Sequence, residues 1–227
     1  DLKLVPSDTK LAKALKTHRK WDSLSEPEKA YWARAMQVNA GMLEAADFHL
    51  GRLLARLEAK GQLDNTLVIV TSDNGPEGST VGFDKGLQGA AFSAWMSMNN
   101  WSTEFEDIGG KNGLTTIGPE WASVSSGPFK LFKFNSSEGG QRVPLIISGA
   151  GIINQTDFLQ GRAHMVDVLP TILDLLDIPF EQNELYGRSL MPLISGQSQQ
   201  VYGPDESYAI EVGGNASLYR GDWKIAR

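Results

Sequence analysis

The sequence predicts an α/β fold built on a doubly wound parallel sheet. A long amphipathic helix covers roughly residues 26–60, and a short turn joins it to a buried strand at 66–71. A second strand of the same kind lies at 143–148, and another helix follows at 167–176. Helices and buried strands that alternate through short turns are typical of α/β proteins.

The long helix has a recognisable start, a helical apolar period and a recognisable end. Ser25–Glu28 combines a serine N-cap, a proline in the first turn and a glutamate three residues after the serine. Gly61 is suited to end the helix, because glycine adopts the left-handed conformation that a helix C-terminus needs. The apolar residues that recur at helical spacing are Trp32, Ala35, Met36, Met42, Leu43, Ala46, Leu50, Leu53, Leu54 and Leu57.

The two predicted strands are short, continuous apolar runs rather than alternating ones. Thr66–Thr71 is rich in β-branched residues, as is usual for a strand buried on both faces of a parallel sheet. Val143–Ser148 has the same character. The helix that follows at Asp167–Leu176 carries Pro170 in its first turn, where proline is tolerated.

Two further stretches complete the predicted organisation. Residues from 75 to about 128 are rich in Gly, Ser, Asn and Trp with little periodicity, which predicts a long loop that is either functional or disordered. Tyr208–Val212 and Ser217–Lys224 predict antiparallel strands. We therefore expect a main α/β domain over residues 1–202 and the beginning of a small antiparallel C-terminal subdomain over residues 203–227.

Composition excludes several classes of protein and site. The net charge is −6 and no dense basic stripe occurs, so nucleic acid is not an expected partner. The longest apolar runs, such as Leu67–Val70, are too short to span a bilayer. The sequence contains no cysteine, which excludes disulfides, thiolate metal sites and a cysteine nucleophile within these residues.

A candidate metal site follows the first buried strand, at Ser72-Asp73-Asn74-Gly75. Ligands of open α/β sheets bind beyond the carboxyl ends of the strands. The Asp73 carboxylate and the Asn74 amide oxygen are hard donors suited to Ca²⁺ or Mg²⁺. Asp-Asn-Gly is also a common turn sequence, and for this pair taken alone the turn is the more frequent explanation. Two ligands do not fill a calcium shell, so further donors must come from elsewhere.

A candidate anion contact precedes the second buried strand. Lys133 is followed by a polar stretch and by Gly139 and Gly140. A lysine ammonium is a compact point charge that can hold a tetrahedral oxyanion. A lone lysine is, however, more often simply solvated.

Together these segments resemble the type I, formylglycine-dependent sulfatases of the alkaline phosphatase superfamily, specifically the bacterial arylsulfatases. The resemblance extends over almost the whole chain, and no single motif carries it alone. The matching residues, in the order of the family, are Ser72-Asp73-Asn74-Gly75, Trp121-Ala122, Pro128-Phe129, Lys133, Glu138-Gly-Gly-Gln-Arg142-Val-Pro144, His164–Thr171, Gly187–Leu190 and Gly221–Lys224.

The resemblance implies a sulfuric ester hydrolase with an alkaline-phosphatase-like doubly wound sheet, incomplete in this chain. In the family a formylglycine made from Cys or Ser attacks sulfur, and one Ca²⁺ neutralises the sulfate oxygens. The resemblance makes Asp73 and Asn74 metal ligands and Lys133 the catalytic residue that contacts the sulfate. It places the nucleophile motif upstream of Asp1, so we expect a fragment that is inactive by itself.

The same resemblance sets the expected partners and location. We expect a small-molecule or glycan sulfate ester as substrate, a periplasmic or secreted bacterial location, and self-association through the apolar edge of Leu67–Val70. Two alternatives stay open: a phosphate or phosphonate ester hydrolase of the same superfamily, and a non-catalytic relative that binds sulfated glycans. The metal pair fits either anion, whereas the Glu138–Pro144 run favours the sulfatases.

Overall fold

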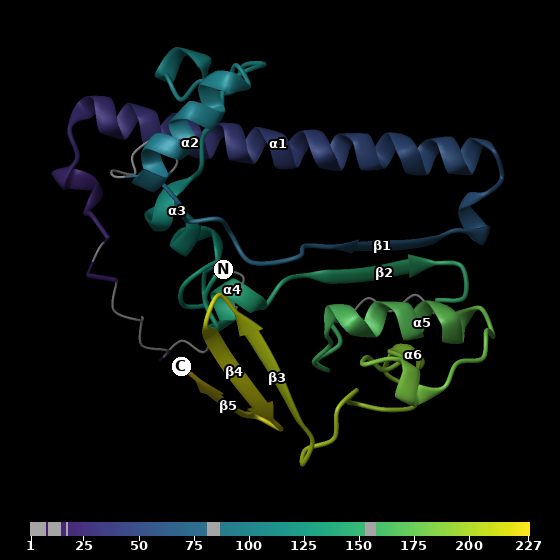
Figure 1. Cartoon of the computed structure of the whole chain (residues 1–227). Helices are drawn as coiled ribbons and strands as arrows, with labels where there is room; N and C mark the ends of the chain where they lie inside the picture. The colour runs from purple at the N-terminus through teal and green to yellow at the C-terminus, as the bar shows by residue number, and fades with distance from the viewer. Residues whose placement is uncertain (1–7, 9–14, 17, 81–86, 153–157) are drawn as a thin grey trace. The chain divides into compact units, whose positions relative to one another are not determined.

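The computed structural model describes the chain as two compact units (Figure 1). Unit 1 comprises residues 1–52 and 74–142, and unit 2 comprises residues 53–73 and 143–227. The residues whose structure is described are 8, 15, 16, 18–80, 87–152 and 158–227.

The mixture of helices and strands confirms the α/β class. The helices are α1 (Glu26–Ala59), α2 (Leu87–Met98), α3 (Gly118–Ser125), α4 (Glu138–Gln141), α5 (Val168–Leu175) and α6 (Met191–Ile194). Short 3-10 turns lie at η1 (Trp21–Ser23), η2 (Leu63–Asn65), η3 (Phe105–Asp107), η4 (Met165–Asp167) and η5 (Gln182–Glu184). The strands are β1 (Leu67–Thr71), β2 (Leu145–Gly149), β3 (Ser207–Val212), β4 (Asn215–Arg220) and β5 (Trp223–Ala226).

The long helix α1 confirms the prediction at both ends. The backbone N–H and the hydroxyl of Ser25 both donate to Oε2 of Glu28, at 2.9 and 2.7 Å, so the predicted start is held by side-chain hydrogen bonds. At the other end Gly61 has a φ of +64°, and the Gln62 N–H donates to the Leu57 carbonyl at 2.9 Å. Local sequence alone therefore determines where this helix begins and ends.

The apolar face of α1 is covered only near its start. Trp32 and Ala35 are buried, whereas Met42 and Leu43 expose 67% and 66% of their surface to solvent. No helix in the described part of the chain is both long and apolar enough to cross a membrane. The helical period was thus correctly predicted, but the described residues bury only part of that face.

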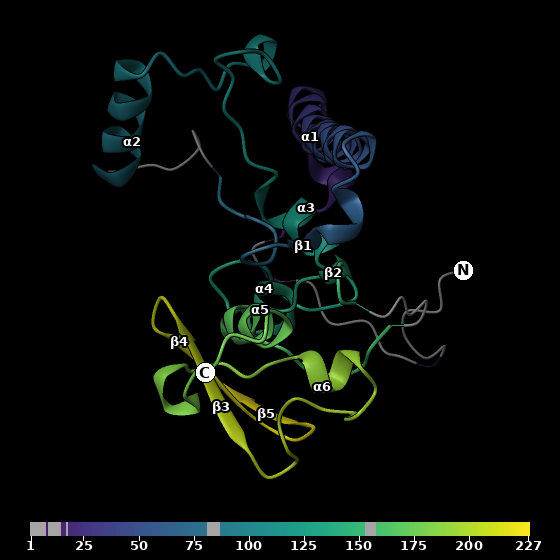
Figure 2. The ribbon, with the colours of Figure 1, turned by 90° about the vertical axis from the view of Figure 1, so that its right-hand side faces the viewer.

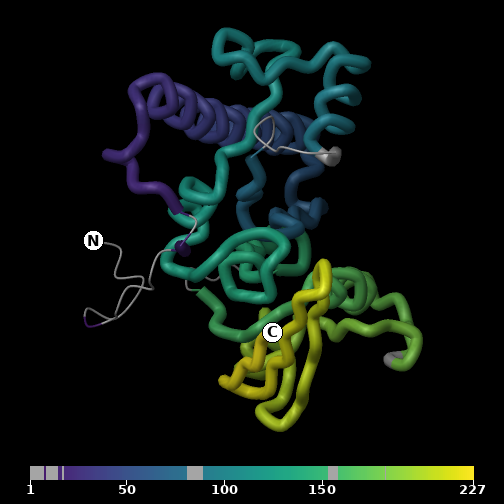
Figure 3. The backbone as a smooth tube through the Cα atoms, turned by 60° about the vertical axis from the view of Figure 1, so that its left-hand side comes forward, coloured from purple at the N-terminus to yellow at the C-terminus, as the bar shows by residue number. Residues whose placement is uncertain are grey.

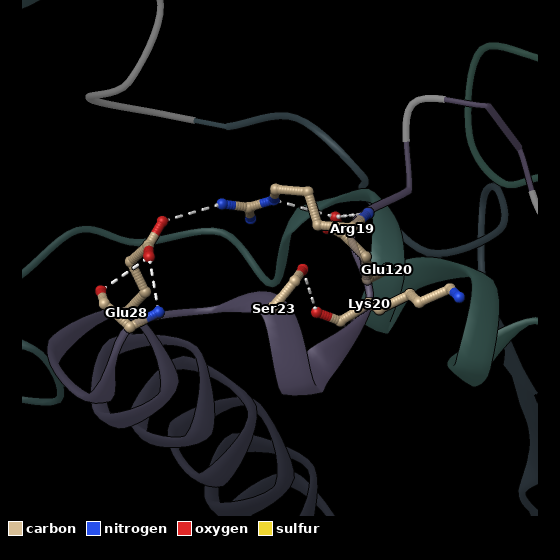
Figure 4. A network of polar contacts seen from close by, with 6 residues as sticks. Arg19, Lys20, Ser23, Glu28 and Glu120 are labelled. Atoms are coloured by element: carbon tan, nitrogen blue, oxygen red, sulfur yellow. Dashed lines mark hydrogen bonds and ion pairs between the residues drawn. The ribbon is translucent and has the colours of Figure 1, made fainter.

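A polar network connects the segment before α1 to α1 and α3 within unit 1 (Figure 4). The Arg19 guanidinium lies 3.3 Å from Glu28 and 3.2 Å from Glu120, and the Ser23 hydroxyl donates to the Lys20 carbonyl at 2.7 Å. These side chains are partly exposed, so each ion pair contributes at most about 1 kcal/mol. Their main effect is to orient the lead-in segment.

The predicted loop at 75–128 is wrong in part, because α2, η3 and α3 form within it. Residues 81–86 of this stretch lie outside the described residues. In α2 the side chain of Met96 is buried, while those of Trp95 and Met98 are exposed. Apolar residues on several faces leave no one-sided period, so the sequence pattern does not reveal the helix.

Strands β1 and β2 of unit 2 pair side by side, but antiparallel rather than parallel (Figure 1). Ile69 lies opposite Ile147, and Val70 and Ile146 expose 37% and 58% of their surface. The expected parallel pairing, buried on both faces, is therefore wrong for this pair. A continuous apolar run indicates a strand but not its direction, which depends on the path of the long connection between the two strands. Self-association through this sheet edge stays a prediction.

The last part of unit 2 confirms the predicted helix and antiparallel strands. Turn η4 leads into α5, which matches the helix predicted at 167–176. The three-stranded antiparallel sheet has the order β3-β4-β5, at the yellow end of the chain in Figures 2 and 3. Gly221 begins the turn that separates β4 from β5, so the single strand expected at 217–224 is two. The division into 1–202 and 203–227 stays a prediction.

A buried carboxylate joins several segments of unit 2. Asp167 is fully buried and accepts hydrogen bonds from the His164 N–H at 2.6 Å, the Arg188 N–H at 2.8 Å and the Tyr202 hydroxyl at 2.6 Å. The Arg188 guanidinium in turn donates two hydrogen bonds of 2.6 Å to Glu206. We call these five residues the Asp167 cluster. It ties the start of α5 to the segment that leads into β3.

Candidate functional site

Two segments that are far apart in the sequence pack together in unit 1. They are residues 74–79, which follow β1 in the sequence, and residues 130–142, which end in α4. The Gly75 N–H donates to the Gly140 carbonyl, and the Lys133 N–H donates to the Pro76 carbonyl, both at 3.0 Å. The structure therefore places the segment of Asn74 against the segment of Lys133, although these residues are about 60 positions apart in the sequence.

Glycines make this close approach sterically allowed. A Cβ placed on Gly75 would overlap the carbonyl oxygen of Gly139, and one on Gly139 would overlap the carbonyl oxygen of Leu131. Both obstacles are backbone atoms, which cannot rotate away as a side chain can. The glycines of the Asp-Asn-Gly and Glu-Gly-Gly motifs are thus required by the packing of the two segments.

Lys133 forms an ion pair with Glu77 across the two segments. Its Nζ lies 3.0 Å from Oε2 of Glu77, and both side chains are about one third exposed. Burial raises the pKa of the Glu77 carboxyl, but hydrogen bonds from Lys133 and Ser79 outweigh it and hold the pKa below its ordinary value. Glu77 is therefore a carboxylate at neutral pH, and it neutralises one lysine charge at this site.

The backbone around Lys133 adopts conformations that are costly for these residue types. Leu131 and Phe134 have positive φ angles of 64° and 67°, which cost roughly 1–2 kcal/mol per non-glycine residue. Side-chain hydrogen bonds hold this path: the Asn135 amide donates to the Lys133 carbonyl at 3.1 Å, and the Ser126 hydroxyl donates to the Leu131 carbonyl at 2.7 Å. The position of Lys133 is thus set by its loop and not only by its own side chain.

The predicted metal ligands are consecutive in the sequence and are assigned to different units. Asp73 is exposed and ends the first segment of unit 2, whereas Asn74 is half-buried and begins the second segment of unit 1. The Asn74 amide nitrogen donates to the Gly75 carbonyl at 2.9 Å, so the donor end of this amide is used within the protein. Its oxygen is the type of atom that coordinates calcium.

The donor chemistry of this pair fits calcium, but only as part of a larger ligand set. Within residues 18–80, 87–152 and 158–227 and the few earlier described positions, no group of three or more histidine or acidic side chains is placed to hold a metal. A carboxylate and an amide oxygen supply two of the six to eight oxygens that calcium takes. The pair is therefore at most part of a calcium site, which needs further oxygen ligands.

A sequence model of the sulfatase family matches residues 8–178, well over half of the chain. The chain belongs to the sulfatase family. The matched range includes residues 74–79, residues 130–142 and the pair Asp73 and Asn74. It confirms the sequence-based assignment to this family of the alkaline phosphatase superfamily.

Relatives with curated sequences agree with the family assignment. An uncharacterized sulfatase of Schizosaccharomyces pombe is 35% identical over 173 residues, which cover 76% of this chain and 30% of that protein. The arylsulfatase of Klebsiella aerogenes is 28% identical over 198 residues, covering 85% of this chain and 40% of that protein. The chain thus spans well under half the length of the curated sulfatases it matches.

Solved structures show the same fold. Ps i-CgsB, solved in complex with k-i-k-neocarrahexaose, aligns over 91% of this chain and 35% of its own, with a TM-score of 0.55 and 21% identity. BT4656, solved with its substrate D-glucosamine-2-N,6-O-disulfate, aligns over 81% of this chain and 29% of its own, with a TM-score of 0.50 and 20% identity. At these identities the likeness concerns the fold alone.

Glu77 was not predicted as a site residue from the sequence. The one available signal was its place three residues after the predicted metal ligands, in Asp73-Asn74-Gly75-Pro76-Glu77. A single acidic residue in a polar loop is usually solvated, and nothing in the sequence connects it with Lys133. Only the packing of the two segments identifies the lysine as its partner.

Proposed function

We propose that this chain supplies part of the active site of a sulfuric ester hydrolase, an arylsulfatase in the broad sense. In this proposal Lys133 contacts the sulfate group, and Asp73 and Asn74 are ligands of one Ca²⁺. The observation that carries it is the packing of the Lys133 segment on the Asn74 segment through two backbone hydrogen bonds. Membership of the sulfatase family supports the same reading.

Lys133 is suited to contact an oxyanion that arrives from solvent. Its backbone is held by Pro76 and its ammonium by Glu77, while about 30% of the side chain is exposed. A lysine ammonium has three N–H donors, and the ion pair with Glu77 takes one direction. The other donors can bind sulfate oxygens and stabilise the charge that develops on the bridging oxygen as the ester bond breaks.

Asp73 and Asn74 would hold the calcium ion through one carboxylate and one amide oxygen. When bound, such an ion neutralises charge on the sulfate oxygens and helps to align the nucleophile. The chain contains no cysteine, so a formylglycine derived from cysteine is not among these residues. We propose that the nucleophile and the remaining calcium ligands lie outside the 227 residues, and that the chain alone does not turn over substrate.

The proposed substrate is a small-molecule or glycan sulfate ester. Two proteins with the same fold support the glycan class, since Ps i-CgsB was solved with k-i-k-neocarrahexaose and BT4656 with a disulfated glucosamine. We also propose a periplasmic or secreted location, which fractionation of the native source tests directly.

The test of the proposed function is hydrolysis of 4-nitrophenyl sulfate by the longest natural polypeptide that contains these residues. We expect Lys133→Ala to lower kcat/KM by about 10²–10³-fold, the usual loss for one group that stabilises an oxyanion. Lys130→Ala is the matched control, because Lys130 is an exposed lysine of the same segment. Equal activity of the two variants would refute the assignment of Lys133.

The calcium assignment has a separate readout. We expect Asp73→Ala to weaken Ca²⁺ binding by at least about tenfold in a calorimetric titration of the same polypeptide, because one charged ligand is lost. Unchanged affinity would show that Asp73 is not a ligand.

Faster hydrolysis of 4-nitrophenyl phosphate than of 4-nitrophenyl sulfate would favour the phosphatase alternative.

A further inference from the structure

We propose that Glu77 is a specificity-determining residue, whose negative charge beside Lys133 disfavours doubly charged esters relative to singly charged ones. A sulfate monoester carries one negative charge, whereas a phosphate monoester carries nearly two at neutral pH. The inference rests on the proposed role of Lys133 as the anion contact. It goes further, because it names the residue by which the site distinguishes two anions of the same shape.

The structure holds the Glu77 carboxylate by both of its oxygens. Oε2 lies 3.0 Å from Nζ of Lys133, and Oε1 accepts the Ser79 backbone N–H at 3.0 Å. The lysine is held at two points as well, since its N–H donates to the Pro76 carbonyl at 3.0 Å. The carboxylate is therefore fixed beside the ammonium and does not swing freely in solvent.

Geometry then determines how far Glu77 lies from a bound anion. The N–H donors of an ammonium point to the corners of a tetrahedron, and each accepts a partner at about 2.9 Å. An ester oxygen bound to a second donor of Lys133 would therefore lie about 5 Å from Oε2 of Glu77. This separation is shorter than the screening length of about 8 Å at physiological salt, so the repulsion is felt.

The repulsion depends on the charge of the ester. Coulomb energy is proportional to the product of the charges, so Glu77 repels a dianion about twice as strongly as a monoanion of the same geometry. The centroid of the Phe134 ring lies 5.1 Å from Nζ of Lys133, a cation–π contact that adds no formal charge. Together Lys133 and Glu77 form a site with no net charge, which suits a singly charged ester better than a lone lysine would.

Nuclear magnetic resonance on the 227-residue chain tests this inference without an activity assay. Lysine labelled with ¹³C reports binding at the Cε of Lys133, whose signal is the one missing from Lys133→Arg. Phenyl sulfate and phenyl phosphate are titrated in a buffer with chelator, at about pH 8 and about pH 5, where the phosphate carries two charges and one charge respectively. Although burial raises it, hydrogen bonds from Lys133 and Ser79 hold the pKa of Glu77 below its ordinary value, and this favours the carboxylate form at both pH values.

We expect Glu77→Gln to improve the affinity for phenyl phosphate relative to phenyl sulfate by about threefold at pH 8, and to leave the ratio unchanged at pH 5. A loss of lysine positioning would weaken binding of the dianion at least as much as binding of the monoanion, so it opposes the expected change and cannot produce it. Glu77→Asp keeps the charge, and Glu106→Gln removes an equal charge from an exposed glutamate elsewhere in unit 1. Both are expected to retain the wild-type ratio.

The outcomes separate this inference from the proposed function. If both anions shift the Lys133 signal but Glu77→Gln leaves the pH 8 ratio unchanged, the inference is overturned and Lys133 remains an anion contact. If neither anion perturbs Lys133 in any variant, this chain has no anion site at Lys133 for Glu77 to tune and the inference is overturned, while the proposed function is judged by the hydrolysis assay of the longer polypeptide. A ratio that changes equally at pH 5 and pH 8 would also overturn the inference, because a charge effect requires the difference.

Discussion

Each unit of the molecule contains a carboxylate at the centre of a polar network, and the two carboxylates differ in burial and in partners. Asp167 of unit 2 is fully buried and accepts hydrogen bonds from two backbone amides and the Tyr202 hydroxyl. Glu77 of unit 1 is about one third exposed and is paired with the Lys133 ammonium. An enclosed carboxylate whose donors come from several segments holds a fold together. An accessible one beside a lysine leaves donors available for a ligand.

The largest expected effect is the loss of the buried carboxylate. Asp167→Ala leaves three hydrogen-bond donors of the Asp167 cluster without their acceptor in a buried site. We expect a destabilisation of about 3–5 kcal/mol, measured as the free energy of unfolding in urea by circular dichroism.

Two milder variants make this prediction specific. Tyr202→Phe removes one of the three donors and is expected to cost about 1–2 kcal/mol. Asp205→Ala removes an exposed carboxylate that pairs with Arg220, and we expect no measurable change. If Asp167→Ala is no more harmful than Asp205→Ala, the Asp167 cluster is not structural.

The second effect concerns the contact between the two segments of unit 1. Gly75→Ala forces a methyl group against the Gly139 carbonyl, which must move because it belongs to the backbone. We expect a loss of about 1–3 kcal/mol in the free energy of unfolding, together with a shifted resonance of Lys133.

Gly51→Ala is the matched control for this substitution. Gly51 lies within α1 with open space around the added methyl group, so alanine is expected to stabilise the chain by about 0.5–1 kcal/mol. The same chemical change is thus expected to have opposite signs at the two positions. Stabilisation at both would show that the two segments are not in close contact.

The smallest effect is a difference in acid sensitivity between the two networks. Burial lowers the pKa of His164 below 6.5, although the negative charge of Asp167 opposes this shift. The stability that neutral His164 contributes is therefore complete above pH 6.5 and is lost as the pH falls through the lowered pKa. Burial raises the pKa of Glu77, but hydrogen bonds from Lys133 and Ser79 hold it below its ordinary 4.5. The contribution of Glu77 to stability is therefore complete above pH 4.5 and is lost as the pH falls through the lowered value.

The urea concentration at the midpoint of unfolding, measured as a function of pH, tests both of these pH ranges. We expect His164→Gln to flatten the curve below pH 6.5 and Glu77→Gln to flatten it below pH 4.5. A His164→Gln curve that parallels the wild type between pH 6.5 and pH 4.5 would contradict the first assignment.

Sequence reasoning succeeded where the determining interactions are local. The ends of α1 follow from Ser25, Glu28 and Gly61, and the structure shows the hydrogen bonds that these residue types are expected to make. The C-terminal strands were likewise readable from short apolar runs and glycine turns. The family, too, was evident from the sequence, and the match over residues 8–178 confirms it.

It failed where a feature depends on contacts between distant segments. The antiparallel pairing of β1 with β2 depends on the path of the chain between them, which the apolar pattern does not encode. Glu77 acquires its partner only because residues 74–79 pack on residues 130–142. The roles of Asp73, Asn74 and Lys133 stay predictions.

The backbone contact at Gly75 and Gly139 has a consequence for large-scale mutagenesis of this gene. In a library of variants selected only for protein abundance, substitutions at these glycines will be depleted. Substitutions at position 133 will be tolerated, because the Lys133 side chain is partly solvent-exposed. After an activity-based enrichment map is corrected for abundance, the glycines will therefore no longer stand out, and Asn74 and Lys133 will remain as intolerant positions of the two segments.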